Sequence, residues 1–470
     1  VATPAPLGLC GFLKSAKAVI AAVTTASALS DADAALKVVQ SKLPPIASSS
    51  PILHFCTSAA IYFTTLAGST YSPSDNIAGI SSATSLSVAP GVSSALSARP
   101  PSLNPSNSSS YPCIADAILL SRCGLPGLKN LSTNDLVCYA VKANSNLSIL
   151  SLIKDEGLGF DVVSGGELKR VLQIGANPRK IVFSGVGKNK SELLLACEAD
   201  IFSINVESEY ELNILEELSK KPRISFRINP DIAAESHPYI ETGKADCKFG
   251  ISEDEALLLA QKYSPDNLNL VGVSAHIGSQ ITNTELLIDS YIKLENLADQ
   301  LCSLGYQIDH IDIGGGLAVD YELEKTFEPE ELIKRIKSVS SKYNLTLEPG
   351  RSIVAQSGAL VTKVLGIKEN GSQRFVIADA GMNDLMRPSL YKARHKIENL
   401  VNSQTKKELY SVVGPVCETA DSFGSDFEIN AKAGDYLAIY SSGAYGSSMG
   451  SNYNSRLKPA EILIEGSHHK

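Results

Sequence analysis

The sequence predicts an α/β protein, in which a (β/α)8 TIM-like barrel is followed by a smaller C-terminal antiparallel β domain. From about residue 134, eight short apolar runs rich in β-branched residues alternate with longer amphipathic stretches. Each run ends in glycine or polar residues, as barrel strands do at the rim that carries catalytic loops. After Arg351 the apolar runs lie close together and are separated by turn residues, which is typical of a β domain. An open, doubly wound sheet has the same alternation and remains the alternative to the barrel.

The expected barrel strands are the apolar runs between about residues 134 and 350. Amphipathic periodicity between them predicts helices, because apolar residues recur there at helical spacing. Eight strands with their helices in roughly 250 residues match the size of a (β/α)8 barrel. The strands are expected at 137–141, 160–163, 180–184, 201–205, 223–229, 270–276, 308–315 and 345–349, and the helices at 191–199, 207–219, 253–262, 285–304 and 329–343.

Composition divides the chain into unlike parts. Residues 1–112 hold three acidic and five basic side chains with 23 serines, and the first glutamate is Glu156. A Ser-rich, acid-poor start is typical of a transit peptide, and its scarcity of arginine favours the plastid stroma. The alternatives for this stretch are a disordered leader or a faulty gene model. The alternative location of the protein is the cytoplasm. We therefore expect a leader at 1–112, the barrel at 113–355 and the β domain at 356–470.

Charge and residue spacing exclude several classes of function. The formal net charge of −8 argues against a nucleic-acid binder, which needs clustered Lys and Arg. The apolar run 51–68 is interrupted by polar residues and falls short of the roughly 20 residues of a spanning helix, so no membrane is expected. The nine cysteines form no CxxC pair and the seven histidines no HExxH motif. We therefore expect neither a metal site nor a disulfide framework.

Lys142, in the segment YAVKAN, directly follows the first expected strand. A lysine at this position points into the barrel mouth, where desolvation would lower its pKa and free the amine as a nucleophile. Schiff-base chemistry requires such a deprotonated amine. The alternative is an ordinary solvated loop lysine.

Three further motifs end at the same rim and indicate an anionic ligand. The glycines at 314–316 lack the rest of a dinucleotide-binding fingerprint. They can let backbone N–H groups approach an anion closely. The alternative is that they form an ordinary tight turn. The EPGR segment at 348–351 adds a guanidinium, which favours an anion. His276, in SAHIGS, adds an imidazole, for which a packed core position is the alternative.

Ten motifs in order identify a resemblance. YAVKANSN, FDVVSGGEL, IVFSGVGK, RINPDIAAESHPYIETGKADCKFGI, AHIGSQI, DIGGGLAVDY, EPGR, DAGMNDLMRPSLY, GPVCETAD and GAYG with SNYNSR occur between residues 134 and 465. Together they resemble the diaminopimelate decarboxylase family, pyridoxal-phosphate enzymes of the alanine-racemase-like fold (fold type III). The resemblance implies the decarboxylation of meso-2,6-diaminopimelate to L-lysine and CO2, the last step of lysine biosynthesis.

The resemblance also implies roles for individual residues. Lys142 would form the Schiff base with pyridoxal 5′-phosphate, His276 would stack on its ring, Glu348 would pair with its pyridine nitrogen, and Asp161 would support Lys142. The catalytic residues implied are Lys142, His276 and Cys417, the last returning a proton to the substrate. The cofactor-binding residues implied are Lys142, Asp161, His276, Ser279, Gly314, Gly315, Gly316, Glu348, Pro349, Gly350, Arg351 and Tyr445.

The implied substrate contacts match charges on a diamino diacid. Arg351, Arg387 and Tyr391 would clamp the distal carboxylate, since forked guanidinium donors suit a carboxylate. Glu418 would take the distal ammonium, and Tyr445 completes the set. In the family, Cys417 and Glu418 reach the active site of a partner subunit, so the resemblance implies a homodimer.

Two readings remain as alternatives to this function. One is a decarboxylase of another basic amino acid, ornithine, lysine or arginine, against which Arg387 argues because such substrates carry no distal carboxylate. The other is a non-catalytic regulator on the same fold. The family's usual strand and helix before YAVKAN have no clear equivalent in this sequence, so a piece of the first barrel unit could be missing.

Overall fold

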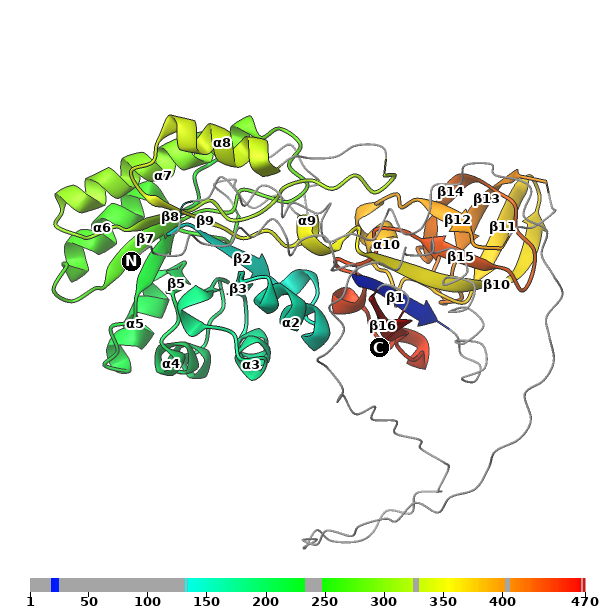
Figure 1. Cartoon of the computed structure of the whole chain (residues 1–470), viewed down its shortest axis with the longest axis horizontal. Coiled ribbons are helices and arrows are strands. Elements are labelled where there is room, and N and C mark those ends of the chain that lie inside the picture. The colour runs from blue at the N-terminus through cyan, green and yellow to red at the C-terminus, as the bar shows by residue number, and fades with distance from the viewer. Residues whose placement is uncertain are drawn as a thin grey trace, which may run out of the picture. The chain divides into compact units, whose positions relative to one another are not determined.

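Eight parallel strands close into a barrel (Figure 1). The computed structural model describes residues 18–24, 132, 134–232, 247–323, 329–401, 406–465 and 468–469. Each barrel strand pairs with its successor in the chain, and the last pairs with the first, so the closed barrel is confirmed and the open sheet is excluded. All eight expected strands are present: β2(Leu136–Ala140), β3(Gly159–Val162), β4(Ile181–Phe183), β5(Ser203–Val206), β6(Ile224–Arg227), β7(Leu270–Ser274), β8(His310–Asp312) and β9(Asn344–Leu347).

Helices follow the strands and cover the outside of the barrel. Several begin at a side chain that caps their first N–H groups: Asn189 accepts from Glu192 N–H, and the Glu192 side chain returns the bond in a capping box. The five expected helices are present, and the sequence analysis missed two short ones, α2 and α3. The set is α2(Leu147–Asp155), α3(Gly165–Gln173), α4(Lys190–Ala199), α5(Glu209–Glu217), α6(Glu253–Tyr263), α7(Glu285–Ser303) and α8(Pro329–Val339).

The barrel strands are buried on both faces. Every residue of β3, β4, β5, β6 and β7 is buried, because helices cover the outer face and side chains fill the inside. Three polar residues of this interior bond to one another: Ser225 Oγ lies 2.8 Å from Ser203 Oγ and 3.0 Å from His310 Nε2. The interior is thus a packed core, which leaves the rims of the barrel for binding.

A second sheet makes up the β domain. Among the described residues it contains nine strands, in the order β14-β13-β11-β10-β1-β16-β17, with β15 pairing β10 and β12. The sheet is mixed, because β1 runs parallel to β10 and β11 parallel to β13, whereas the sequence predicted an antiparallel domain. The strands are β1(Ala18–Thr24), β10(Gly358–Asn370), β11(Gln373–Ala378), β12(Ile397–Asn399), β13(Glu408–Val413), β14(Ser422–Ile429), β15(Tyr436–Ile439), β16(Ala460–Glu465) and β17(His468–His469).

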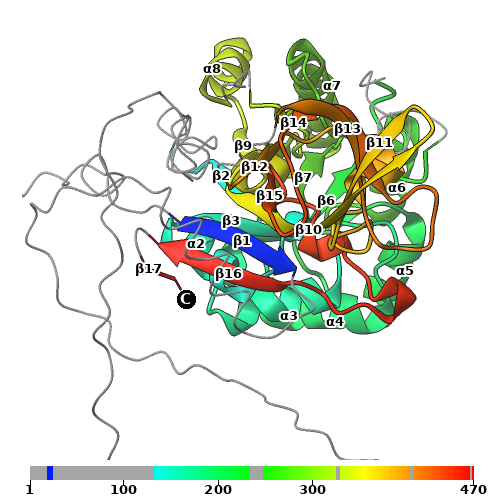
Figure 2. The same ribbon diagram turned by 90° about the vertical axis from the view of Figure 1, so that its right-hand side faces the viewer.

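Strand β1 comes from the stretch that the composition assigned to a leader. It lies between β10 and β16, and Figure 2 shows it (blue) beside β16 (red). Its backbone pairs Ala21 with Ala359 on one side and with Ile462 on the other. Part of residues 1–112 therefore belongs to the folded sheet, and removing the whole stretch would remove one of its strands. Serine content and charge could not show this, because they say nothing about backbone pairing.

Other expectations for the N-terminal region lie outside the described residues. They are the rest of the leader, the apolar run 51–68, and most of the stretch 113–133 before the first barrel strand. Within the described residues, no helix is long and apolar enough to cross a membrane, and no cluster of potential ligands could hold a metal ion. The cysteines of that part, at positions 138, 197, 247, 302 and 417, form no disulfide there.

The loop after β15 attaches the β domain to the barrel rim. The short helix α9(Arg351–Val354) connects β9 to β10, and Gly443 N–H donates to Ala355 O at 3.0 Å. Asn144, just after Lys142, donates to Gly443 O at 3.1 Å, and Tyr445 N–H donates to Ala143 O at 2.8 Å. These bonds bring residues 443–445 next to the end of β2.

We expect Gly443→Ala to destabilise the protein by about 1–3 kcal/mol, because the added methyl overpacks this attachment. A Cβ at position 443 would lie 1.9 Å from the backbone oxygen of Val354. Gly366→Ala in β10 is the matched control, since its Cβ would meet no described atom within 4 Å. Thermal unfolding of both variants measures the difference. Equal melting temperatures for the two would contradict this account of the attachment.

Candidate active site at the barrel rim

Lys142 lies at the carboxyl end of β2, in the 3-10 turn Val141–Ala143. Its Nζ donates to Asp161 Oδ2 of β3 at 2.7 Å, and the Asp161 side chain is fully buried. The Lys142 side chain is 31% exposed, so it lies at the mouth of the barrel, as expected.

The expected lowering of the Lys142 pKa is wrong for this arrangement. Burial alone would lower this pKa, but the charges of Asp161, Tyr445 and Glu348 outweigh it and raise the pKa. Lys142 is therefore held as an ammonium by Asp161. The sequence prediction failed because it considered desolvation without the carboxylates that neighbouring strands bring to the same rim.

Three buried carboxyl groups lie around Lys142: Asp161, Asp312 at the end of β8, and Glu348 after β9. Burial, together with the charges of Asp161 and Asp312, raises the pKa of Glu348 well above its usual value. Burial also raises the pKa of Asp312, which shares a hydrogen bond with Glu348. Two buried carboxyls in contact cannot both ionise without a cation. A cationic N–H donor, such as a protonated pyridine ring, would supply the partner that Glu348 lacks.

Two residues that the sequence analysis named only as polar strand ends orient Glu348. Ser184, after β4, donates to Glu348 Oε1 at 3.2 Å. Asn205 of β5 donates from Nδ2 to Ser184 Oγ at 3.0 Å and lies 3.4 Å from Glu348 Oε1. Polar residues at successive strand ends indicated a rim, but only the closed barrel brings these two to a carboxylate of the last strand.

The glycines after β8 form a cradle that no other residue could form. Gly314 and Gly316 have φ of +69° and +103°, and a Cβ on either would lie 2.6 and 2.4 Å from the backbone oxygens of Ala275 and Gly278. Gly315 is equally close to the backbone, 2.2 Å from Glu348 O. The three glycines therefore let the chain after β8 pack closely against neighbouring backbone, and a glycine turn of this kind can present N–H groups to an anion.

Residues of three other segments surround this cradle. Arg351 donates from Nη2 to Ser279 Oγ at 2.8 Å, and its Cζ lies 4.7 Å from the ring centroid of Tyr445. Pro349 and Gly350 connect Glu348 to Arg351. The cradle, the guanidinium and the buried acid together fit pyridoxal 5′-phosphate, which has a phosphate at one end and a basic ring nitrogen at the other.

His276, two residues beyond β7, is neutral. Burial and the nearby cations Lys142 and Arg227 lower its pKa well below its usual value. Its Nδ1 accepts from the Gly278 N–H at 3.3 Å, which leaves the hydrogen on Nε2. A neutral, flat imidazole on this rim suits packing against an aromatic cofactor ring.

A cluster of two arginines and two aromatic rings lies at the rim beside the β domain. Arg387 begins the short helix α10(Arg387–Tyr391), and its Nη1 donates to His395 Nε2 at 2.8 Å. Its Cζ lies 4.0 Å from the ring centroid of Tyr321, whose hydroxyl accepts from Arg351 Nη1 at 2.5 Å. Tyr391 is half-buried at the end of the same helix.

Both guanidiniums of this cluster lack a counterion. Arg351 is 7% exposed and Arg387 is 3% exposed, and within the described part of the chain neither pairs with a carboxylate. The Nε of each is buried without a hydrogen-bond partner in that part. Burial lowers the pKa of Arg387 to about 10. Buried cations without partners are costly, so this cluster is suited to an anionic ligand.

Cys417 and Glu418 lie apart from this site within the chain. They follow β13 in the β domain and are exposed. The Cys417 N–H donates to Asn454 Oδ1 at 2.9 Å, and Tyr453 OH donates to Glu418 Oε1 at 2.5 Å. Among the described residues, these contacts join them to the C-terminal loop and not to Lys142.

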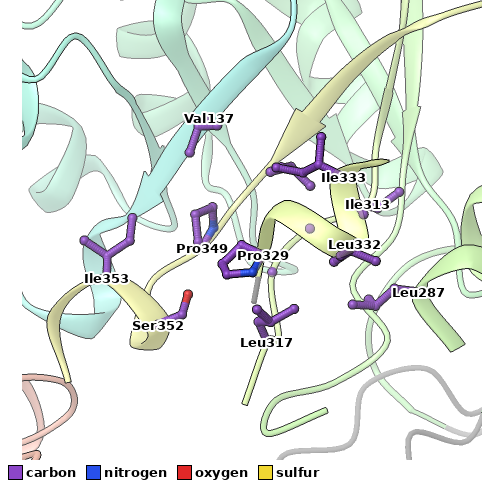
Figure 3. Close-up of a pocket in the computed structure, with 13 residues that line it drawn as sticks. Val137, Leu287, Ile313, Leu317, Pro329, Leu332, Ile333, Pro349, Ser352 and Ile353 are labelled. Carbon is purple, nitrogen blue, oxygen red and sulfur yellow. The ribbon is translucent and has the colours of Figure 1, made fainter. Parts of the chain in front are cut away.

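An apolar pocket lies behind the glycine cradle (Figure 3). It is lined from α7, α8, β2 and β9, by side chains such as Leu287, Leu332, Ile333 and Val137. None of its lining residues carries a charge or a titratable side chain. It therefore offers no chemistry, and we place the reaction on the Lys142 side of the cradle.

Comparisons with known proteins show which proteins this chain resembles. The family model for the pyridoxal binding domain of pyridoxal-dependent decarboxylases matches residues 127–355. Diaminopimelate decarboxylase of Vibrio cholerae is 47% identical over 339 residues, which are 70% of this chain and 81% of that protein. The relative from Aquifex aeolicus is 44% identical over 339 residues, again 70% of this chain and 81% of that protein.

Solved structures show the same fold. Diaminopimelate decarboxylase from Helicobacter pylori complexed with L-lysine is 43% identical, with a TM-score of 0.71, and the match covers 76% of this chain and 91% of that one. Lysine/ornithine decarboxylase from Vibrio vulnificus is 21% identical with a TM-score of 0.64, covering 72% of this chain and 90% of that one, and supports the fold alone.

We expect Asp161→Asn to lower the pKa of Lys142, because it removes the carboxylate that stabilises the ammonium. In the cofactor-free wild type, labelling of Lys142 by pyridoxal 5′-phosphate and borohydride should rise about tenfold per pH unit between about pH 6 and 9, since a raised pKa keeps the neutral amine scarce throughout. In Asp161→Asn the rise should level off at a pH lower by roughly one to three units.

Mass spectrometry of the Lys142 peptide measures this labelling at each pH. Asp155→Asn, which changes an exposed carboxylate at the end of α2, is the control and should match the wild type. Superimposable profiles for wild type and Asp161→Asn would contradict the ion-pair account of Lys142.

Proposed function

This chain belongs to the diaminopimelate decarboxylase family of pyridoxal-dependent enzymes, and we propose from this membership that it converts meso-2,6-diaminopimelate to L-lysine and CO2. It is a carboxy-lyase of lysine biosynthesis with pyridoxal 5′-phosphate as its cofactor. Relatives at 42–47% identity carry the name diaminopimelate decarboxylase, and one solved relative holds L-lysine. The chain spans about four fifths of the length of these relatives.

The observation that carries this proposal is the pair of uncompensated guanidiniums, Arg351 and Arg387. A diaminopimelate molecule has a second carboxylate at the end remote from the reacting carbon. Ornithine and lysine have only an ammonium at that end, which two buried cations would repel. The cluster thus favours the diacid over the smaller basic amino acids.

Different residues of the rim have different roles in binding the cofactor and in holding protons. When bound, pyridoxal 5′-phosphate supplies the electron-accepting ring that takes up the electrons left by departing CO2. Lys142 is the amine that holds the cofactor, and Asp161 keeps that amine oriented. Glu348 would accept a hydrogen bond from the ring nitrogen, and its own position is maintained by Ser184 and Asn205.

The phosphate end of the cofactor has a separate set of contacts. The cradle glycines would offer close backbone approach, and Ser279, which accepts from Arg351, would add a hydroxyl. Tyr445 lies against Arg351 at the edge of this set. Pro349 and Gly350 keep the chain narrow here, since a Cβ at position 350 would lie 2.9 Å from Ala140 Cβ.

We also propose a homodimer in which each active site is shared. Cys417 and Glu418 are needed near the reacting carbon and the distal ammonium, yet in this chain they are exposed on the β domain. The same surface carries Tyr453, bonded to Glu418 and 46% exposed, and Leu457, 86% exposed. An apolar surface next to two unused functional groups favours contact with a second copy.

A non-catalytic regulator on the same fold is the contrasting possibility. It would not need the Schiff-base amine, whereas this chain retains Lys142 in contact with Asp161. An absorbance scan distinguishes the two: an enzyme of this class should show a pyridoxal–lysine absorption band that borohydride abolishes. Failure of the purified protein to retain the cofactor would favour the regulator.

We expect Arg387→Ala to lower kcat/KM for meso-diaminopimelate by roughly 10- to 100-fold, because a charge-assisted bond to the distal carboxylate is lost. Activity on L-ornithine and L-lysine, which lack that carboxylate, should not fall. Steady-state assays of CO2 release measure both. Arg374→Ala, an exposed arginine on β11 paired with Glu369 and Glu408, is the control and should match the wild type. An equal loss on all three substrates would contradict the assigned clamp.

Mixing two inactive variants tests the shared site. Lys142→Ala and Cys417→Ala should each be nearly inactive, but a mixture allowed to exchange subunits should regain up to about a quarter of wild-type activity, because half of its dimers are mixed and each of these has one intact site. Activity of the mixture after exchange, monitored together with oligomeric state, is the measurement. No recovery despite demonstrated exchange would rule out sharing.

A further inference from the structure

His395 is buried beside Arg387 and belongs to none of the motifs considered above. It is 1% exposed and lies just before β12. Its Nε2 is 2.8 Å from Arg387 Nη1, and its Nδ1 is 2.7 Å from the backbone oxygen of Tyr440, directly after β15. Strands β12 and β15 are paired, and the Tyr440 N–H donates to Lys396 O at 3.0 Å. The sheet therefore holds the imidazole in place from two sides.

These two hydrogen bonds determine the protonation state of His395. A guanidinium can only donate, so Nε2 must be the unprotonated acceptor. Nδ1 then carries the hydrogen and donates it to Tyr440 O. Burial and the adjacent Arg387 lower the pKa of His395 to about 3, in agreement with a neutral ring.

The side chain of Tyr321 contacts both cations of the cluster. Cζ of Arg387 lies 4.0 Å and Cζ of Arg351 lies 6.0 Å from its centroid. The His395 ring meets the same ring edge-on, with centroids 4.7 Å apart. A π face attracts a cation, so Tyr321 allows both guanidiniums to be buried in one cluster.

We propose that His395 is a positioning residue for the substrate. It fixes one corner of the Arg387 guanidinium, so that the remaining Nε edge is presented to the distal carboxylate of a diacid. Tyr321 supports the flat side of the same group. This inference rests on the proposed function and adds to it a residue that selects for diacids without touching the cofactor.

The physical benefit is a lower entropy cost of binding. An arginine side chain has many rotamers, and its planar fork binds a carboxylate well only in one orientation. Fixing that orientation before the substrate arrives removes part of the ordering cost. The benefit applies to ligands with a distal carboxylate, and a ligand that ends in an amine gains nothing from it.

Two substitutions test the two hydrogen bonds of His395 independently. In His395→Gln the amide oxygen can take the place of Nε2 and accept from Arg387. In His395→Asn the shorter amide can still donate to Tyr440 O but leaves Arg387 without its acceptor. Each holoenzyme would be assayed for KM and kcat with meso-diaminopimelate, and for binding of pimelate and of 1,5-diaminopentane, which has no carboxylate, by calorimetry.

We expect His395→Asn to raise KM for meso-diaminopimelate and Kd for pimelate by roughly tenfold or more, because a hydrogen bond to a charged group is lost. kcat, the Kd for 1,5-diaminopentane and the cofactor absorbance should stay within about threefold of wild type. In His395→Gln, KM for meso-diaminopimelate and Kd for pimelate should lie within about threefold of their wild-type values. Tyr321→Leu, which removes the supporting ring, should also raise KM for meso-diaminopimelate and Kd for pimelate. This variant replaces His395→Asn in the test if His395→Asn does not fold.

Three results would overturn the inference: KM for meso-diaminopimelate and Kd for pimelate unchanged in both His395→Asn and Tyr321→Leu, a parallel loss of 1,5-diaminopentane binding, or no rescue by His395→Gln. Failure of the proposed function gives a different result, since the wild-type holoenzyme would then release no CO2 from meso-diaminopimelate. The two failures are therefore distinguishable.

Discussion

Buried charge without an internal partner is the constraint on which the rest of this site depends. Arg351 and Arg387 are buried with no carboxylate from the described residues, while on the opposite side Asp312 and Glu348 share the site with a single ammonium, Lys142. Burying charges in this way costs stability unless a ligand completes the pairs. A cofactor with an anionic phosphate and a protonated ring nitrogen, together with a diacid substrate, supplies the missing charges with the correct signs.

The two parts of the fold provide the two halves of this arrangement. The closed barrel brings the ends of strands distant in sequence to one rim, so that Glu348 of the last strand meets Ser184 and Asn205 of middle strands. The β domain contributes Arg387, whose guanidinium is held by His395, and His395 is held in turn by the backbone of Tyr440. The chemistry thus requires both parts, and the loop at 443–445 joins them next to Lys142.

The sequence correctly predicted those elements whose pattern lies in residues close together along the chain. Eight apolar runs with polar ends predicted the barrel and its rim, and ordered motifs placed Lys142, the glycine cradle and Arg387. It failed where the outcome depends on pairing between distant segments. The β1 strand was assigned to a leader, because its partners in the sheet lie more than 300 residues away. The Lys142 pKa was expected to fall, because the two carboxylates that raise it, Asp161 and Glu348, come from other parts of the barrel. His395 carried no signal, since its role exists only after β12 and β15 have paired.

The central claim is that the uncompensated guanidiniums of the rim take the distal carboxylate of the substrate. A crystal structure of the Lys142→Ala variant with pyridoxal 5′-phosphate and meso-diaminopimelate tests it most directly, because this variant cannot complete turnover through its amine. We expect the distal carboxylate within hydrogen-bond distance, about 2.7–3.0 Å, of Arg387 Nε or Arg351 Nε. A substrate bound with that carboxylate in solvent, and both Nε atoms still unpartnered, would contradict the account.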